Sequence, residues 1–159
     1  MTPTPPVIAS LVVGSNWAST LKGTSRQLRT PEDRERFLAL RNSPDIGAII
    51  VGRVSAEVEP YQKTPHPLFV YQRSSGLSPG DFIDHIRGEV SGAILCEGGV
   101  TLIHQLLLAN YLDQFYLTRA PLHGDDHYLD IDLMRTKMSL VSREEVAGTT
   151  FEKYERASR

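Results

Sequence analysis

The amino-acid sequence predicts an α/β fold built on a mixed sheet. Short apolar runs rich in β-branched residues alternate with segments of helical spacing, the pattern of parallel strands joined by helices. Near the C-terminus two strand-like runs follow each other with no helix between them, which predicts an antiparallel pair. The chain of 159 residues has the length of one domain, and we expect residues 1–159 to form it.

The composition and charge of the chain exclude several classes of protein. Hydrophobic residues make up 40% and charged residues 23%, a balance typical of a globular domain and unlike that of a disordered chain. The net charge is −2 and no basic cluster stands out, so we expect no nucleic-acid partner. The sequence has neither an apolar run of ~20 residues nor the pattern of a secretory signal, so we expect no membrane partner and a cytoplasmic location.

The first third of the chain predicts two buried strands around one helix. Val7–Val13 is apolar and β-branched, so it predicts a buried strand. Thr30 precedes Pro31 and a first turn that contains acids, which is the signature of a helix start, and the helix should end near Pro44. Ala48–Val51 predicts a second buried strand, closed by Gly52.

The middle of the chain predicts two further strand-and-helix units. Leu68–Tyr71 predicts a third strand, and residues 74–80 form a cluster of turn residues. Asp81–Val90 has apolar residues at helical spacing. Ala93–Cys96 predicts a fourth strand, which leads into a strongly apolar helix from Thr101 to about residue 111.

The last part of the chain predicts a sheet edge. Phe115–Thr118 predicts a fifth strand. After Gly124 the pattern changes, and Lys137–Ser142 and Thr149–Tyr154 predict two strands joined by a turn near Gly148. The sheet is therefore expected to be parallel at first and to end in an antiparallel hairpin.

The junction between the fourth strand and the apolar helix is the strongest local signal for a ligand. Gly98 and Gly99 separate a buried strand from a helix start, where backbone N–H groups lie at the positive end of the helix dipole. Glycines let a phosphate approach the backbone closely because no Cβ intrudes. A plain tight turn explains the pattern equally well, since neither the P-loop lysine nor the full dinucleotide-binding glycine spacing is present.

The run LCEGGVTL, followed by LLLANYLDQFYLTRAPLHG, extends from Leu95 to Gly124. It resembles the reductase domain of the bifunctional riboflavin-biosynthesis deaminase/reductase, of the dihydrofolate-reductase-like family. Residues 23–34 (GTSRQLRTPEDR), 48–52 (AIIVG) and 67–73 (PLFVYQR) are similar to earlier stretches of the family and occur in the same order. The resemblance implies a dihydrofolate-reductase-like mixed sheet, mostly parallel with an antiparallel C-terminal hairpin and with helices on both faces.

The resemblance also implies a reaction and a set of site residues. The reaction is NADPH-dependent reduction of 5-amino-6-(5-phosphoribosylamino)uracil or a similar pyrimidine, a small-molecule substrate. The implied substrate-binding residues are Ser25, Arg41 and Glu97, and the implied cofactor-binding residues are Ser55, Arg73, Ser74, Gly98, Gly99, Val100 and Thr101. A guanidinium and a hydroxyl at residues 73–74 suit the 2′-phosphate that distinguishes NADPH from NADH.

Assembly as a homodimer is expected for three reasons. Related reductases are commonly dimers, and the helix after Glu97 is apolar around more than one face, which predicts burial on two sides. The C-terminal hairpin also offers a sheet edge for pairing.

The chain departs from the family at three places. Trp17-Ala18 stands where relatives carry an Asp-Gly pair, and the stretch from Gly52 to Ser55 is a shortened turn into which Arg53 enters. The segment between Arg73 and Glu97 is shorter by a strand-and-helix unit. These departures keep two alternatives open: a divergent non-catalytic or regulatory member of the family, and a reductase of dihydrofolate or another pterin.

Four other features have ordinary explanations. The stretch from His123 to His127 combines histidines with aspartates, but such residues are common in a loop, so we expect no metal. Cys96 ends an apolar strand and is expected to be a buried, inert thiol. His104 is expected to be a packing or interface residue. Trp17 is either a stacking platform for a ligand ring or a lid packed on the core.

Overall fold

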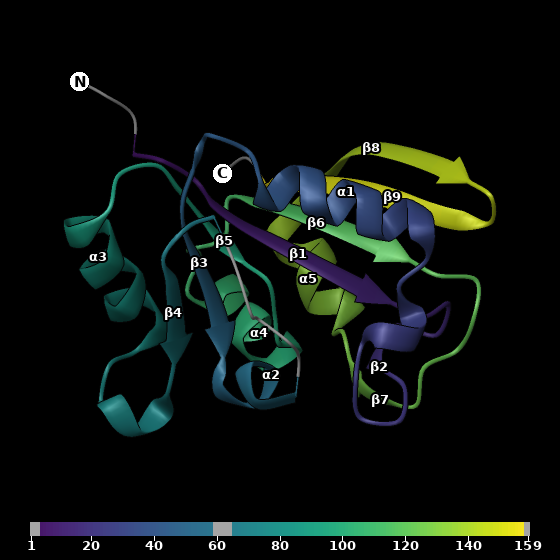
Figure 1. Cartoon of the computed structure of the whole chain (residues 1–159), viewed down its shortest axis with the longest axis horizontal. Helices are drawn as coiled ribbons and strands as arrows, with labels where there is room; N and C mark the ends of the chain where they lie inside the picture. Colours follow the sequence, from purple (N-terminus) through teal and green to yellow (C-terminus); the bar gives the residue numbers. More distant parts are fainter. Residues whose placement is uncertain (1–3, 59–64, 158–159) are drawn as a thin grey trace.

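The computed structural model describes residues 4–58 and 65–157, and its centre is a seven-stranded sheet (Figure 1). The strand order is β4-β3-β5-β1-β6-β9-β8. Neighbouring strands from β4 to β6 are parallel, whereas β9 runs antiparallel to both β6 and β8. The strands of this sheet are β1 (Val7–Val13), β3 (Ile46–Gly52), β4 (Leu68–Tyr71), β5 (Ala93–Cys96), β6 (Gln114–Arg119), β8 (Met138–Val146) and β9 (Thr149–Arg156).

Three of the predicted strands, β1, β4 and β5, have the bounds expected from the sequence. Every residue of β5 is buried, as is every residue of β1 except Ser10, because helices cover both faces of the sheet centre. A continuous apolar run is what such a strand requires. The strand β3 is longer than predicted at both ends, and β8 begins one residue later and extends four residues further than predicted.

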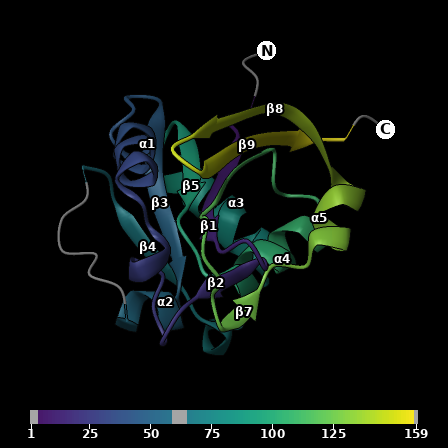
Figure 2. The ribbon, with the colours of Figure 1, turned by 90° about the vertical axis from the view of Figure 1, so that its right-hand side faces the viewer.

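Helices lie on both faces of the sheet, as predicted (Figure 2). On one face α1 packs near a small cluster around Ile8 and Ile49, and on the other α3, α4 and α5 enclose the main core. The helices are η1 (Arg26–Leu28), α1 (Pro31–Arg41), α2 (Arg53–Val58), η2 (Arg73–Ser75), α3 (Pro79–Glu89), α4 (Val100–Leu108) and α5 (Ile131–Lys137). None of the helices among the described residues is long and apolar enough to cross a membrane.

The start of α1 has the capping geometry that the sequence predicts. The Thr30 hydroxyl accepts a hydrogen bond from the backbone N–H of Asp33 at 3.2 Å, and Pro31 occupies the first turn. The same hydroxyl lies 3.1 Å from that of Thr149 at the start of β9. This contact ties the first turn of α1 to the C-terminal hairpin, so the orientation of α1 on the sheet is fixed at both the cap and the packed face.

Several elements were not predicted from the sequence. The stretch after Gly52 is the helix α2 and not a shortened turn, and α5 precedes the C-terminal hairpin. The strands β2 (Ala18–Thr20) and β7 (Asp126–Tyr128) begin at Trp17-Ala18 and in the expected loop at residues 123–127, and they pair antiparallel. Strands of three residues carry no alternation, and they form because the fold brings segments over 100 residues apart side by side.

The apolar side chains that α4 carries on more than one face are buried within the chain itself. Leu102, Ile103, Leu106 and Leu107 are all buried between the sheet and its neighbours α3 and α5, and only Leu108 is largely exposed. The sheet edge that was expected to pair in a dimer is β8, an edge strand on which Leu140 and Val141 are about half exposed. A dimer would therefore use this edge and not α4.

We expect light scattering at micromolar concentration to give twice the chain mass of 17.7 kDa. The variant Val141→Lys should give the monomer mass, because a charge at the edge strand opposes pairing between two copies. Leu108→Lys is the matched control, since it changes an exposed leucine on α4 and should leave the mass unchanged. A monomer mass for the unmodified chain would contradict the homodimer.

Candidate functional site

A cavity of about 810 Å³ opens at the carboxyl ends of β1, β3, β4 and β5. In open α/β sheets this edge is where ligands bind. The cavity is bordered on one side by η1 and α1 and on the other by α2, η2 and the start of α4. All the site residues inferred from the sequence line it: Ser25, Arg41, Ser55, Arg73, Ser74, Glu97, Gly98, Gly99, Val100 and Thr101.

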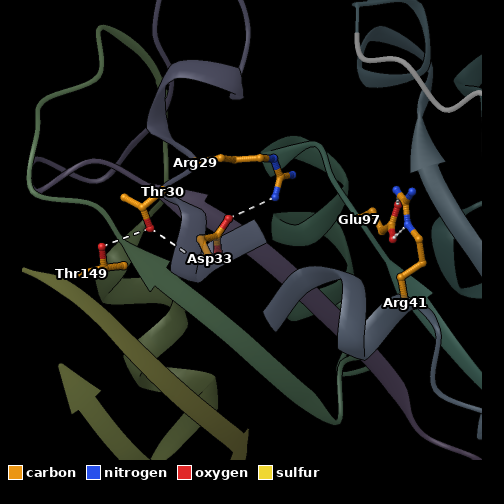
Figure 3. Close-up of polar contacts among 6 residues, drawn as sticks. All are labelled: Arg29, Thr30, Asp33, Arg41, Glu97 and Thr149. Atoms are coloured by element: carbon orange, nitrogen blue, oxygen red, sulfur yellow. Dashed lines mark hydrogen bonds and ion pairs between the residues drawn. The ribbon is translucent and has the colours of Figure 1, made fainter. Parts of the chain in front are cut away.

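Two of the inferred substrate-binding residues are bonded to each other (Figure 3). Nε of Arg41 at the end of α1 donates to Oε2 of Glu97 at 2.8 Å, and a second nitrogen of the guanidinium donates to Oε1. The Glu97 side chain is fully buried and that of Arg41 is 13% exposed. The pair is therefore a bidentate, largely desolvated ion pair in the cavity wall, and the two residues act there as one unit.

Arginines dominate the cavity lining. Arg29 donates to Asp33 at 3.2 Å, and the Arg29 and Arg41 guanidinium carbons lie 4.3 Å and 4.6 Å from the centroid of the Phe37 ring. The described residues place six arginines around the cavity but only one acid, Glu97, although the whole chain is slightly acidic. The arginines are Arg26, Arg29, Arg34, Arg41, Arg53 and Arg73. Such a surface attracts an anionic ligand.

The spacing of two of these arginines in the sequence indicates a shared helix face, although Arg34 was not among the predicted site residues. Arg34 and Arg41 are seven residues apart on α1, with Phe37 and Leu38 between them at helical spacing. Residues at these positions share one face of a helix, and that face lines the cavity. Arg36, two residues from Arg34, points elsewhere and forms an ion pair with Glu144 of the hairpin.

The Gly98-Gly99 turn forms the floor of the cavity between β5 and α4. Gly98 has a φ of +125°, a conformation that favours glycine, and the peptide bond between the two residues is cis. A Cβ on Gly99 would lie 2.9 Å from Oγ of Ser55. A backbone hydrogen bond links the turn to β3: the N–H of Gly52 donates to the Gly98 carbonyl at 2.9 Å.

The start of α4 is open towards the cavity. Gly99 is its N-cap residue and has no side chain to bond the first N–H groups of the helix, and Val100 and Thr101 line the cavity. The helix has nine residues, so its aligned dipoles place positive charge at this end. A phosphate group fits this arrangement, because a bare glycine cap, the helix dipole and nearby arginines all favour negative charge.

Ser55, Arg73 and Ser74 form the wall beside this turn. Ser55 comes from α2, and its hydroxyl is the side-chain atom nearest to the two glycines. Arg73 and Ser74 belong to η2 directly after β4, and both side chains are exposed at the mouth of the cavity. This exposed position suits contact with an outer part of a long ligand.

Cys96 and His104 have structural roles. Burial raises the pKa of the Cys96 thiol to about 12, so the thiol stays protonated and is no nucleophile. Nε2 of His104 accepts the backbone N–H of Asp130 at 2.9 Å, which ties α4 to the N-cap residue of α5. Burial lowers the pKa of His104, and its ring does not line the cavity.

Trp17 packs on the core and does not line the cavity. Its ring lies near two guanidinium groups, with Arg119 at 4.7 Å and Arg135 at 5.9 Å from the ring to the guanidinium carbon. Of the two interpretations left open by the sequence, the geometry favours the lid on the core. Within the described part of the chain, no group of three or more His, Cys, Asp or Glu side chains could hold a metal ion.

No family model and no curated sequence matches the chain. A pyrimidine reductase-like protein from Corynebacterium diphtheriae is similar in structure with a TM-score of 0.73 and 19% identity, over 98% of this chain and 93% of that one. Dihydrofolate reductase from Enterococcus faecalis, complexed with NADP(H), has a TM-score of 0.65 and 16% identity, over 96% and 97% of the two chains.

A third similar structure is a bifunctional protein. It is the diaminohydroxyphosphoribosylaminopyrimidine deaminase/5-amino-6-(5-phosphoribosylamino)uracil reductase from Thermotoga maritima, with a TM-score of 0.72 and 14% identity. The match covers 97% of this chain and 57% of that one. At these identities the comparisons establish the architecture and not the activity. The chain has the dihydrofolate-reductase-like fold that its sequence motifs predicted.

Proposed function

We propose that the protein is an NADPH-dependent reductase of a phosphorylated ribosylamino-pyrimidine, 5-amino-6-(5-phosphoribosylamino)uracil or a close analogue. The observation that carries the proposal is the division of one cavity into two anion-suited halves. The glycine turn and the start of α4 form one half, and the arginines of η1 and α1 form the other. A reductase that joins a nucleotide cofactor to a phosphorylated substrate needs both halves in one cavity.

The residues of the first half fit a nicotinamide dinucleotide phosphate. Gly98 and Gly99 leave space that a Cβ would fill, the start of α4 offers N–H groups to the pyrophosphate, and Arg73 with Ser74 suits the 2′-phosphate. When bound, the cofactor supplies a hydride to an electrophilic carbon of the substrate. The protein contributes position and charge, because these residues hold the two ligands in one place and orientation.

The residues of the second half fit the phosphoribosyl part of the substrate. Arg26 and Arg34 line the cavity and have exposed side chains, and Arg29 is held in place by Asp33 and Phe37. Guanidinium groups bind phosphate oxygens through paired N–H donors. Glu97, held by Arg41, is the carboxylate of the wall and suits a ring N–H or a sugar hydroxyl.

The role of the second half is tested by the phosphate of the substrate. We expect the chain to oxidise NADPH in the presence of the phosphorylated ribosylamino-pyrimidine and to turn over its dephosphorylated form far more slowly. Arg34→Ala should lower kcat/KM for the phosphorylated substrate. The loss of transition-state stabilisation should be about 1.5–3 kcal/mol, the value of a lost hydrogen bond to a charged group. Arg36→Ala is the control, because this arginine lies on the same helix but pairs with Glu144. Equal turnover of both forms would contradict the phosphate role.

Cofactor choice is tested by Arg73. We expect Arg73→Ala to weaken NADPH binding about tenfold and to change NADH binding little, because only NADPH carries the 2′-phosphate. Arg53→Ala is the matched control, since Arg53 lies at the start of α2 and should affect both cofactors to the same extent. Nicotinamide fluorescence titration measures both affinities. Equal losses for the two cofactors in Arg73→Ala would assign Arg73 a structural role.

A second candidate function is reduction of a pterin such as dihydrofolate. The observation that favours it is Glu97, a fully buried carboxylate in the cavity wall that could accept hydrogen bonds from a heterocyclic ring. The row of arginines favours the phosphorylated substrate over the pterin. NADPH oxidation with dihydrofolate but not with the ribosylamino-pyrimidine would reverse this order. Absence of NADPH binding would favour a non-catalytic member of the fold.

A further inference from the structure

His127 belongs to a two-stranded ribbon that forms one wall of the cavity. The ribbon consists of β2 and β7, which lie side by side in Figure 2. Ser19, Thr20 and His127 of the ribbon all line the cavity. The Ser19 hydroxyl donates to the His127 carbonyl at 2.6 Å, which fixes the backbone of His127 against β2. His127 has a φ of +56°, which is uncommon for a residue other than glycine.

The hydrogen bonds around Thr20 suit one tautomer of the His127 ring. The Thr20 hydroxyl donates to the carbonyl of Asp126 at 3.2 Å, and it lies 3.0 Å from Nδ1 of His127. With its single proton on that carbonyl, the hydroxyl accepts from Nδ1. In this arrangement the neutral ring carries its proton on Nδ1. Among the described residues, Nε2 has no hydrogen-bond partner.

The other titratable groups of the cavity lining are poor proton donors. The six arginines do not give up a proton in proteins. Glu97 is a carboxylate held by the Arg41 guanidinium, and the Tyr71 hydroxyl donates to the carbonyl of Leu77 at 2.8 Å. Histidine is the side chain whose charge changes between about pH 5 and 8. Among the described lining residues, His127 is the histidine, and we take it as the candidate proton donor.

We propose that Nε2 of His127 donates the proton that completes the reduction, an inference that rests on the reductase function proposed above. A reduced nicotinamide supplies a hydride to the carbon of a C=N bond in the substrate, and the π electron pair moves to the nitrogen. That nitrogen takes the proton of Nε2, so the products are an amine, the oxidised nicotinamide and a neutral imidazole. The neutral ring then has its remaining proton on Nδ1, which is the form that can donate to the Thr20 hydroxyl.

Charged groups of the ribbon and of the cavity surround the ring. Oδ2 of Asp126 lies 3.8 Å from Nδ1, and the Asp125 carboxylate accepts the backbone N–H of Lys22. The six arginines line the same cavity as His127. The proposal predicts that kcat/KM falls as pH rises, because the protonated ring is the donor.

The form of the ring is measured directly by nitrogen NMR of the full chain labelled with ¹⁵N-histidine. We expect the neutral His127 ring to have its proton on Nδ1, whereas Thr20→Val, which removes the acceptor, should populate both tautomers. The resonance is assigned by its loss in His127→Gln. A neutral ring protonated on Nε2 would overturn the proposal, whatever the substrate proves to be.

The role in turnover is measured with the phosphorylated ribosylamino-pyrimidine. We expect His127→Gln to lower kcat about 100-fold, as for loss of a general acid, to lose the fall of kcat/KM with pH, and to bind NADPH as before. His123→Gln is the matched control, because His123 is exposed in the same stretch and does not line the cavity. Unchanged turnover and pH profile in His127→Gln would overturn the proton-donor role alone. An unmodified chain that binds NADPH but reduces nothing would overturn the reductase function and this role together.

Discussion

Replacing Arg41 with alanine should lower the free energy of unfolding by about 3–5 kcal/mol, because it removes the guanidinium that is ion-paired with the buried Glu97 carboxylate. The carboxylate is fully buried and accepts two hydrogen bonds from that guanidinium. Removing one member of such a pair costs far more than removing an exposed pair. Urea unfolding followed by circular dichroism measures the change.

Two further variants test whether the loss of stability in Arg41→Ala comes from the buried ion pair or from a general effect on α1. Arg36→Ala removes an exposed ion pair from the same helix and a contact with the Phe151 ring, and it should cost no more than about 1.5 kcal/mol. The double variant Arg41→Met with Glu97→Leu should recover most of the stability, because apolar side chains can replace a buried ion pair at little cost. A loss below about 1 kcal/mol in Arg41→Ala would show that the pair is solvated.

The variant Gly99→Val should weaken NADPH binding at least tenfold, which is about 1.4 kcal/mol. The added side chain enters the space between the glycine turn and α2, where its Cβ alone would lie 2.9 Å from Oγ of Ser55. It would also cover the first N–H groups of α4, at which the pyrophosphate is proposed to bind. Nicotinamide fluorescence titration measures the affinity.

The controls for Gly99→Val test whether space at the turn is the cause. Gly88→Val on α3 places a side chain where no atom lies within 4 Å of the Cβ, and it should leave NADPH affinity unchanged. Gly99→Val combined with Ser55→Ala removes the contact with the serine and keeps the branched side chain at the turn, and it is compared with Ser55→Ala alone because Ser55 is an inferred cofactor contact. If the side chain blocks the phosphate, the double variant binds more weakly than Ser55→Ala. Wild-type affinity in folded Gly99→Val would remove the turn from the cofactor site.

The sequence by itself was sufficient to predict the strands at the centre of the sheet. The strands β1 and β5 are buried on both faces, so each is a continuous apolar run with a defined beginning and end. The capping threonine and proline of α1 and the turn near Gly148 were also predictable, because these signals depend on neighbouring residues only. The family resemblance and these elements together predicted the fold.

The site was predictable in part. Glu97 and the turn of Gly98 and Gly99 could be found because a strand end, two glycines and a helix start are consecutive in the sequence. The motif resemblance supplied Ser25, Arg41 and Arg73, and these residues line the same cavity as the turn. Arg34 was missed although its spacing from Arg41 places both on one helix face, because the spacing alone does not tell which face meets the cavity.

Only the tertiary structure decided how these residues meet. Arg41 and Glu97 are 56 residues apart, and their ion pair exists because the end of α1 lies over the carboxyl end of β5. Thr20 and His127 are 107 residues apart and share a hydrogen bond because β2 and β7 pair. Apolar periodicity and capping are properties of consecutive residues, so the sequence shows them directly. Contacts between distant side chains depend on the packing of whole elements, which no local pattern contains.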